Sequence, residues 1–294
     1  MSDLANLLSI YQKMVNEAID KYLPTQKRLP PIIHEAMRYS ALSKGKRIRP
    51  ILALETTKML LGSCESALPS AIAIELAHCF TLIHDDLPSI DNDDLRRGLP
   101  TNHKKYGEGM AILAGDALLI DAFRIIADYQ TPRKTVPDVI SVLTNALSSN
   151  GVIGGQAVDI LAEKKILKHD KDILQFLHIN KTAKLIQASV LIGAIIAQAN
   201  KEVYNSLKEA SLKVGLAFQI KDDLLDITSD KETLGKNIGR DEELGKLTYP
   251  KLFGIKEAQK VCNQLQSDSV DLLKKINNSE ELINIFEFLV NRNF

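Results

Sequence analysis

The sequence has no tryptophan, few aromatic residues and no excess of either charge. Aromatic residues make up 5% of the 294 positions, and 37 basic side chains balance 37 acidic ones. A chain with zero formal charge has no general electrostatic attraction for nucleic acid or for an anionic membrane. We therefore expect no nucleic-acid binding, and any anion site must come from local clustering of basic side chains.

Cysteine is also scarce. The three cysteines, Cys64, Cys79 and Cys262, show none of the spacings of a zinc site. So few thiols are typical of a reducing compartment. The first residues lack a basic stretch followed by an apolar core, and we find no apolar run that reaches the length of a membrane span. These absences predict a cytoplasmic protein without membrane insertion.

Helical periodicity is the main pattern that is present. Hydrophobic residues are 45% of the chain and recur mostly with the period of an α-helix. Residues 70–84 and 186–199 are apolar over most of a helical circumference, which indicates buried helices. Predicted helices include residues 67–86, 169–198, 201–226 and 249–276. Without a repeat or a flexible linker, we predict a single all-α domain over residues 1–294, a large helical bundle with a central cavity.

Two groups of aspartates stand far apart in the chain. The first comprises Asp85, Asp86 and Asp91, and the second comprises Asp222, Asp223 and Asp226. Crowded carboxylates repel one another unless a cation neutralises them. Because Mg²⁺ is usually held by a few carboxylates together with substrate phosphates, the two groups predict a shared magnesium site and a phosphate or diphosphate substrate.

The spacing within the two groups differs. Asp222 and Asp226 are four residues apart, so they lie about 40° apart around a helix and share a face. Asp85 and Asp91 are six apart, and Pro88 disturbs a helix between them. We therefore predict that the helix ends near residue 86 and that a bulge returns Asp91 toward the metal. A solvated helix end and a surface loop are the plain alternatives.

Basic side chains in several places could hold phosphate oxygens. Arg96 and Arg97 follow the first aspartate group, and a guanidinium binds such oxygens with a planar fork. Lys46 and Arg49 are neighbours at a predicted helix start, where amides also attract anions. Lys181 interrupts an apolar helix, which is costly unless it meets an anion. Pairing with nearby aspartates and a surface basic patch are the alternatives.

Three further positions add to this inventory. His78 lies two helical turns before the first aspartate group, on nearly the same face, and could contact the bound anion rather than be a core histidine. Lys236 and Lys246 lie on a polar, glycine-bearing stretch that predicts a lid. The sequence has no dinucleotide motif, P-loop or nucleophile elbow. The cations suffice for two separate anionic groups.

At these positions the chain resembles trans-prenyl diphosphate synthases, and among them the bacterial-type farnesyl diphosphate synthases (geranyltranstransferases). The motifs of the resemblance extend over nearly the whole chain and occupy residues 45–50, 78–98, 155–159, 181–182, 218–226, 234–236 and 245–250. The resemblance implies an isoprenoid synthase fold, a homodimer, and isopentenyl and allylic diphosphates as substrates.

The resemblance also implies a role for each site residue. The ligands of three Mg²⁺ ions would be Asp85, Asp86, Asp91, Asp222, Asp223 and Asp226. Isopentenyl diphosphate would be held by Lys46, Arg49, His78 and Arg97, and substrate binding would also involve Gly45 and Lys246. The allylic diphosphate would contact Arg96, Lys181, Gln219 and Lys236. The developing allylic cation would lie beside Lys181, Thr182 and Gln219, which with Arg96 are the expected catalytic residues.

Product length is expected to depend on Phe80 and Thr81. Phe80 is five residues before Asp85, hence about 7.5 Å deeper along the helix axis. A ring there would act as a floor, with the small Thr81 beside it, and within the family that the chain resembles such a floor implies the fifteen-carbon farnesyl product. A geranylgeranyl diphosphate synthase is the nearest alternative. The second basic group disfavours a class I terpene cyclase, and the complete aspartate groups disfavour a non-catalytic prenyltransferase subunit.

Overall fold

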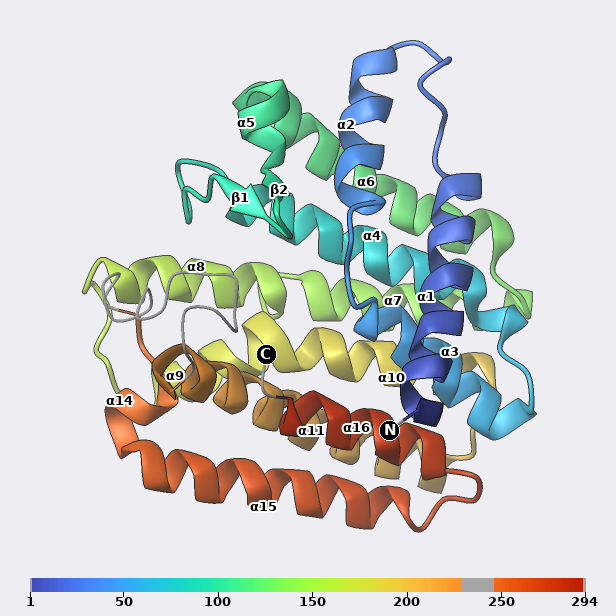
Figure 1. Cartoon of the computed structure of the whole chain (residues 1–294). Helices are drawn as coiled ribbons and strands as arrows, with labels where there is room; N and C mark the ends of the chain where they lie inside the picture. The colour runs from blue at the N-terminus through green and yellow to red at the C-terminus, as the bar shows by residue number, and fades with distance from the viewer. Residues whose placement is uncertain (1, 229–245, 293–294) are drawn as a thin grey trace. The chain divides into compact units, whose positions relative to one another are not determined.

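The structure is a computed structural model that describes residues 2–228 and 246–292 (Figure 1). It divides into two compact units, Met1–Ile140 and Ser141–Phe294, which are described separately. Both units are almost entirely helical in their described residues, so the predicted all-α class is confirmed. A single domain over the whole chain stays a prediction.

The first unit is built around one buried helix. Its elements are α1 (Ser2–Tyr22), α2 (Pro31–Ala41), α3 (Ile48–Leu61), η1 (Glu65–Ala67), α4 (Leu68–Asp85), β1 (Leu95–Arg96), β2 (Leu99–Pro100), α5 (Asn102–Tyr106), α6 (Glu108–Tyr129) and η2 (Arg133–Thr135), and α7 (Val136–Leu147) crosses into the second unit. Helix α4 packs against α6, α3, α1 and α2. Most of its residues from Pro69 to Ile83 are buried, as its continuous apolar sequence predicts.

A short hairpin and a short helix follow α4, and the sequence analysis did not anticipate either. Strands β1 and β2 pair antiparallel, with Leu95 opposite Pro100 and Arg96 opposite Leu99. Two residues a strand are too few to show a period-two pattern. The turn between the strands contains Arg97 and Gly98, both with positive φ. The hairpin therefore determines where the two consecutive arginines lie.

The second unit is also built around one helix. Its elements are α8 (Val152–Glu163), α9 (Lys171–Leu177), η3 (His178–Ala183), α10 (Lys184–Ile196), α11 (Lys201–Thr228), α14 (Tyr249–Phe253), α15 (Ile255–Leu273) and α16 (Glu280–Asn291). Helix α11 packs against α15, α10, η3, α16 and α14. Each unit thus has a central helix, α4 or α11, and one of the two aspartate groups lies at the C-terminal end of each.

Two of the predicted helices are interrupted. The predicted helix over residues 169–198 contains a π-helical segment, η3, between α9 and α10. Gly155 of α8 and Gly215 of α11 pack directly on η3. A Cβ at Gly155 would come within 2.4 Å of the backbone nitrogen of Lys181, and a Cβ at Gly215 would come within 2.8 Å of the Ala183 Cα. The predicted helix over residues 249–276 is divided into α14 and α15 at Gly254, which has a φ of 82°.

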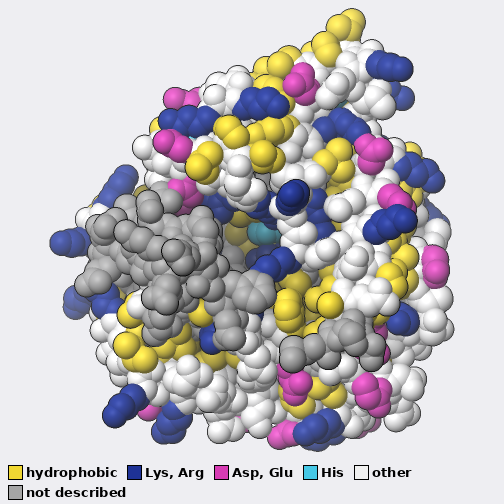
Figure 2. All heavy atoms as spheres, in the orientation of Figure 1, with side chains coloured by type: hydrophobic (Ala, Val, Ile, Leu, Met, Phe, Trp, Pro, Cys, Tyr) yellow, Lys and Arg dark blue, Asp and Glu magenta, His cyan; other side chains and the backbone are white. Residues whose placement is uncertain are grey.

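Two helical stretches pass a length and hydropathy test for a membrane span, Glu65–Asp85 and Lys171–Ile196. By that measure the expectation that no apolar run is long enough was wrong. Their most apolar windows are 78% and 72% buried inside the fold, as is usual for core helices of soluble proteins. Charged side chains of both signs are interspersed over the face drawn in Figure 2, as the balanced composition predicts.

Candidate active site

The first aspartate group lies at the end of α4. The helix stops at Asp85, and the chain then turns so that the Asp91 amide donates to the Asp85 carbonyl at 2.8 Å. This turn brings Asp91 back beside the helix end although the two residues are six positions apart. The predicted bulge is therefore present, and it places two of the expected ligands together at one point of the first unit.

Asp86 is buried, whereas Asp85 and Asp91 are partly exposed. Its Oδ1 accepts from Arg96 Nε at 2.8 Å and also pairs with Arg96 Nη2, which in turn reaches Asp93 Oδ2 at 3.0 Å. Burial raises the pKa of the Asp86 carboxyl, and the Arg96 hydrogen bond and charge oppose this. The carboxylate orients the guanidinium expected to bind substrate, and its role as a metal ligand stays a prediction.

The basic loop before α3 is held by Arg47, a residue to which the sequence analysis assigned no role. Arg47 has a φ of 53° and a fully buried side chain. Its Nη1 donates to Glu75 Oε1 at 2.6 Å, and its Nε donates to Asn16 Oδ1 at 2.9 Å. Its Nη2 donates to the carbonyls of Ala41 and Ser43. Arg47 therefore ties the end of this loop, with Lys46, and the start of α3, with Arg49, to α4 one turn before His78.

Arg49 and His78 meet in this part of the first unit. Arg49 Nη1 lies 3.3 Å from His78 Nε2. Because a guanidinium only donates, this imidazole nitrogen must accept and carries no proton. Burial, followed by the charge of Arg49, holds the pKa of His78 well below its ordinary value of 6.5, and the charges of Arg97, Arg96 and Arg47 act in the same direction. His78 is thus neutral and belongs to a strongly cationic cluster.

Arg97 lies against the same basic loop. Its Nη1 donates to Ser43 Oγ at 3.3 Å, and a Cβ at Gly45 would come within 2.6 Å of that nitrogen. A side chain at position 45 would therefore displace the Arg97 guanidinium from the loop. A small cavity of 30 Å³ borders Ser43, Arg96 and Arg97. It is large enough for one water, and the two arginines border it together with apolar side chains such as Leu82.

The second aspartate group occupies the last turns of α11. Asp222 pairs with Nη2 of Arg292, whose guanidinium carbon lies 3.7 Å from the centroid of the Phe218 ring. Asp222 and Asp226 are both partly exposed on this helix, as their shared face predicts. A cation from the C-terminal end of the chain therefore already balances one of the carboxylates, an interaction that the sequence analysis did not anticipate.

Asp223 is buried and fully engaged. Its Oδ1 accepts from Gln219 Nε2 at 3.0 Å, and its Oδ2 accepts from the Tyr249 amide at 2.8 Å. His178 Nε2 lies 3.1 Å from the same Oδ2, close enough for an ion pair although outside hydrogen-bond geometry. Because a carboxylate only accepts, Asp223 fixes which end of the Gln219 amide faces it. As it stands Asp223 orients Gln219, and its metal role stays a prediction.

Three of the expected catalytic residues lie close together in the second unit. Thr182 Oγ1 donates to Gln219 Oε1 at 2.5 Å, which extends the chain of contacts from Asp223. Lys181 pairs through Nζ with Asp159 of α8, a buried carboxylate. The segment η3 therefore presents an ammonium and a hydroxyl from consecutive positions, and α11 adds an amide oxygen. Such groups can stabilise developing positive charge nearby through their oxygens and hold an anion through the lysine.

Comparison with known proteins identifies this arrangement. The sequence profile described as Polyprenyl synthetase matches residues 30–287. This chain belongs to the polyprenyl synthetase family. It is therefore a prenyltransferase, a conclusion that its relatives support.

The relatives agree on the reaction type but carry different product names. The chain is 42% identical to a geranylgeranyl diphosphate synthase of Cyanophora paradoxa, over 98% of this chain and 97% of that protein. It is 41% identical to a farnesyl diphosphate synthase of Micrococcus luteus, over 96% of each. A solved FPP/GFPP synthase from Zymomonas mobilis shares the fold with a TM-score of 0.86 at 33% identity, over 98% of this chain and 99% of that one.

Polyprenyl synthetases generally use Mg²⁺, and the carboxylates of this member suit that ion. Among the described residues, no three His, Cys, Asp or Glu side chains converge as a closed metal site requires. Mg²⁺ needs no such cage, because it is usually bound by one or two carboxylates with water and substrate phosphates completing its shell. The pair Asp85 and Asp91, brought together by the turn after α4, fits that pattern.

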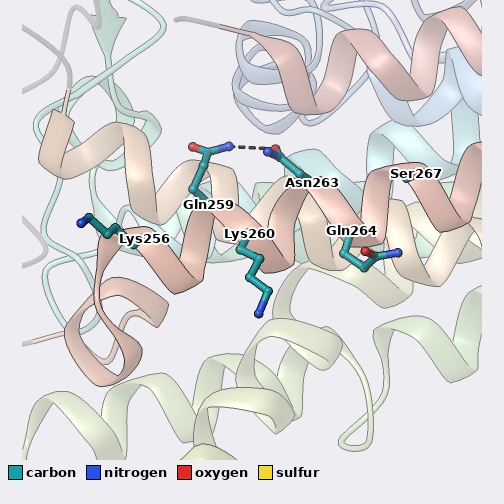
Figure 3. Close-up of a pocket in the computed structure, with 6 residues that line it drawn as sticks. All are labelled: Lys256, Gln259, Lys260, Asn263, Gln264 and Ser267. Atoms are coloured by element: carbon teal, nitrogen blue, oxygen red, sulfur yellow. Dashed lines mark hydrogen bonds between the residues drawn. The ribbon is translucent and has the colours of Figure 1, made fainter.

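Of the expected lid lysines, Lys236 lies outside the described residues. Lys246 Nζ lies 3.7 Å from Glu163 Oε1 of α8, within the second unit. A surface depression of 560 Å³ lies on α15 (Figure 3). Its lining side chains, from Lys256 to Ser267, all come from one helix and include none of the expected site residues. It therefore has no part in the synthase site.

Proposed function

We propose that this prenyltransferase is a farnesyl diphosphate synthase. It would join isopentenyl diphosphate head-to-tail to dimethylallyl diphosphate and then to geranyl diphosphate, and release (2E,6E)-farnesyl diphosphate. The observation that carries the fifteen-carbon product is Phe80, whose ring is 7% exposed on α4, about 7.5 Å along the axis before Asp85. A large, rigid ring at that depth limits how far a growing prenyl tail can extend.

Residues of the first unit would bind isopentenyl diphosphate. Lys46, Arg49 and Arg97 supply the charge, and neutral His78 lies against Arg49. A neutral imidazole keeps one N–H for a phosphate oxygen while its other nitrogen orients the guanidinium. Arg97 beside Gly45 completes a cluster in which several donors can engage one diphosphate.

The allylic diphosphate would be bound by Arg96, Lys181, Gln219 and Lys236, and Lys246 would take part in substrate binding. The proposed ligands of three Mg²⁺ ions are the six aspartates of the two groups, acting on this one diphosphate. The bound metal would supply charge that stabilises the departing diphosphate. Arg96, oriented by Asp86, and Lys181, paired with Asp159, would add fixed positive charge at the same leaving group.

Ionisation of the allylic substrate would leave a carbocation that the chain must protect. Thr182 Oγ1 and Gln219 Oε1 supply oxygen dipoles in the second unit. The double bond of isopentenyl diphosphate attacks the cation, and a proton is then lost to the released diphosphate. No protein base is needed, and apolar side chains such as those of α4 would exclude water that would quench the cation.

A geranylgeranyl diphosphate synthase is the second candidate. The relative from Cyanophora paradoxa bears that name at 42% identity, as close as the farnesyl synthase of Micrococcus luteus at 41%. The two reactions use the same site and differ by one cycle. Phe80 favours the shorter product, because a longer tail would need the space that the ring fills.

A homodimer is part of the proposal. Helix α6 exposes Ile112, Leu113 and Ile120, with Ile120 at 67%. An exposed apolar helix face is typical of a subunit interface. The cytoplasm is the proposed location, although several relatives are chloroplastic proteins.

The proposal is tested by incubating the protein with isopentenyl diphosphate, dimethylallyl diphosphate and Mg²⁺, followed by chain-length analysis. We expect mainly the fifteen-carbon product from the wild type and longer products from Phe80→Ala, because the ring no longer blocks the tail. Cys79→Ala is the matched control, since it removes only a sulfur atom at the preceding buried position of α4, to which no role in product length is assigned. Failure of folded wild-type protein to elongate any allylic substrate would reject the synthase. An unchanged product length in Phe80→Ala would reject the role of the ring.

A further inference from the structure

The Phe80 ring has a specific partner on its own helix. The rings of Phe80 and His84 meet edge to face, with their centroids 4.8 Å apart and their planes at 74°. Residues four apart on a helix lie one above the other, so His84 sits one turn along α4 from the ring. An edge-to-face contact restricts the orientation of both rings. The position of Phe80 therefore depends on what holds His84.

His84 is held by helix α6. Its Nε2 lies 3.1 Å from the carbonyl oxygen of Ile112, and since a carbonyl only accepts, this nitrogen carries the proton and donates. The same nitrogen lies 3.8 Å from a carboxylate oxygen of Asp116. Two contacts from one helix thus fix the imidazole at its outer end.

Gly115 leaves the space on α6 that the His84 imidazole occupies. A Cβ built on Gly115 would come within 2.4 Å of His84 Nε2 and 2.6 Å of its Cδ2. Real Cβ atoms do not approach so closely, so any side chain at 115 would push the imidazole off α6. The residue is in a helix interior, where glycine costs stability relative to alanine, and the close approach of His84 accounts for its presence.

We infer that His84, seated on Gly115, is a positioning residue for product length. It fixes the Phe80 ring across the path of the growing tail. Product length then depends on Phe80 and His84 of α4 together with Gly115 of α6, and not on Phe80 alone. This inference rests on the proposed function, because it assumes that the tail extends along α4 toward Phe80.

The experiment compares two alanine substitutions on the same helix. Gly115→Ala places a methyl group where His84 lies, whereas Gly109→Ala places one where nothing lies within 4 Å. We expect the ratio of longer product to the wild-type product to rise severalfold in Gly115→Ala and to stay unchanged in Gly109→Ala. Equal product ratios in the two folded variants would overturn the inference.

A double variant separates positioning from a general loosening of the site. If His84 acts through Phe80, adding Gly115→Ala to Phe80→Ala should lengthen the products no further, because the ring to be positioned is gone. Full additivity of the two changes would overturn the inference. His84→Gln serves if Gly115→Ala does not fold, since it keeps a donor for the Ile112 carbonyl but removes the ring that faces Phe80, and it too should lengthen the product.

Different results would reject the synthase activity and the role of His84. If wild-type protein forms no elongated product, the synthase is rejected whatever the variants do. If wild type elongates and both Gly115→Ala and His84→Gln keep its product ratio, the synthase stands and the role of His84 is rejected.

Discussion

At the scale of single residues, Arg47 shows how a buried charge can hold a site without touching substrate. Both partners of the Arg47–Glu75 pair are almost fully buried, and the guanidinium also binds two backbone carbonyls of the loop before α3. Removing one member of a buried pair leaves the other charge without compensation. The pair therefore stabilises the first unit and positions the basic loop at once.

The corresponding prediction concerns Arg47→Met. We expect the free energy of unfolding to fall by about 3–5 kcal/mol, measured by denaturant titration. The KM for isopentenyl diphosphate should rise more than the KM for the allylic substrate, because the basic loop is displaced. Lys13→Met is the control, since Lys13 and its partner Glu17 are 78% and 67% exposed and the loss should be about 1 kcal/mol or less. Equal losses in the two variants would contradict the prediction.

A second prediction at this scale concerns pH. The folded chain keeps His78 neutral because its pKa lies well below 6.5, whereas the unfolded chain takes up a proton near that value. The unfolded state then binds more protons, so the contribution of His78 to stability is present above about pH 6.5 and is lost as pH falls below it.

We expect the melting temperature of the wild type to fall between about pH 7 and 5, and to fall less in His78→Gln, which cannot take up a proton. His169→Gln is the control, because it removes an imidazole that lies away from the arginine cluster and contacts the Ala162 carbonyl through Nε2. Parallel curves for wild type and His78→Gln would show that His78 does not contribute.

At the scale of elements, helix α6 has two faces with different tasks. One face packs on α4, where Gly115 lies against the His84 imidazole, while the other exposes Leu113 and Ile120. The fold of the first unit leaves Ile120 67% exposed, although an apolar side chain is more stable when it is buried. The proposed homodimer accounts for it.

We expect Ile120→Glu to convert a dimer to monomer, measured by light scattering after size exclusion, because a charge would be buried without a partner. Ile10→Glu on α1 is the control, since Ile10 is also exposed, at 53%, but lies on another helix. A wild-type protein that is monomeric, or a dimer that survives Ile120→Glu, would contradict the proposed interface.

The elements also show where sequence patterns suffice. The predicted helix over residues 67–86 corresponds to η1 and α4, and its burial follows from continuous apolar residues. The π-helical segment η3 was not predicted, because one extra residue in a turn leaves the apolar pattern almost unchanged. Gly254 was read as part of a helix, although its positive φ divides α14 from α15. Local pattern thus predicts the presence of a helix better than its interruptions.

At the scale of the whole molecule, the proposed reaction requires carboxylates from both units to act on one diphosphate. If they do, the loss of either group should remove the same step, so their effects should not multiply. We expect Asp85→Asn and Asp222→Asn each to lower kcat by about 100-fold or more, and the double variant to be little worse than either alone.

Asp94→Asn is the control, because Asp94 is 72% exposed and pairs with Lys104 on the surface. Its kcat should stay near the wild-type value. Effects of Asp85→Asn and Asp222→Asn that multiply fully in the double variant would indicate that the two groups act in separate steps.

The sequence by itself determined the chemistry of this protein. Aspartates, lysines and arginines at fixed spacings, and helical periodicity throughout, are local properties that can be recognised without a structure. Only the tertiary structure decided which of those residues act on others. Glu75 meets Arg47 across 28 positions, the Tyr249 amide meets Asp223 across 26, and His84 meets Ile112 across 28. Such contacts depend on how helices pack and not on the pattern within any one of them, so they cannot be read from the periodicity of the chain.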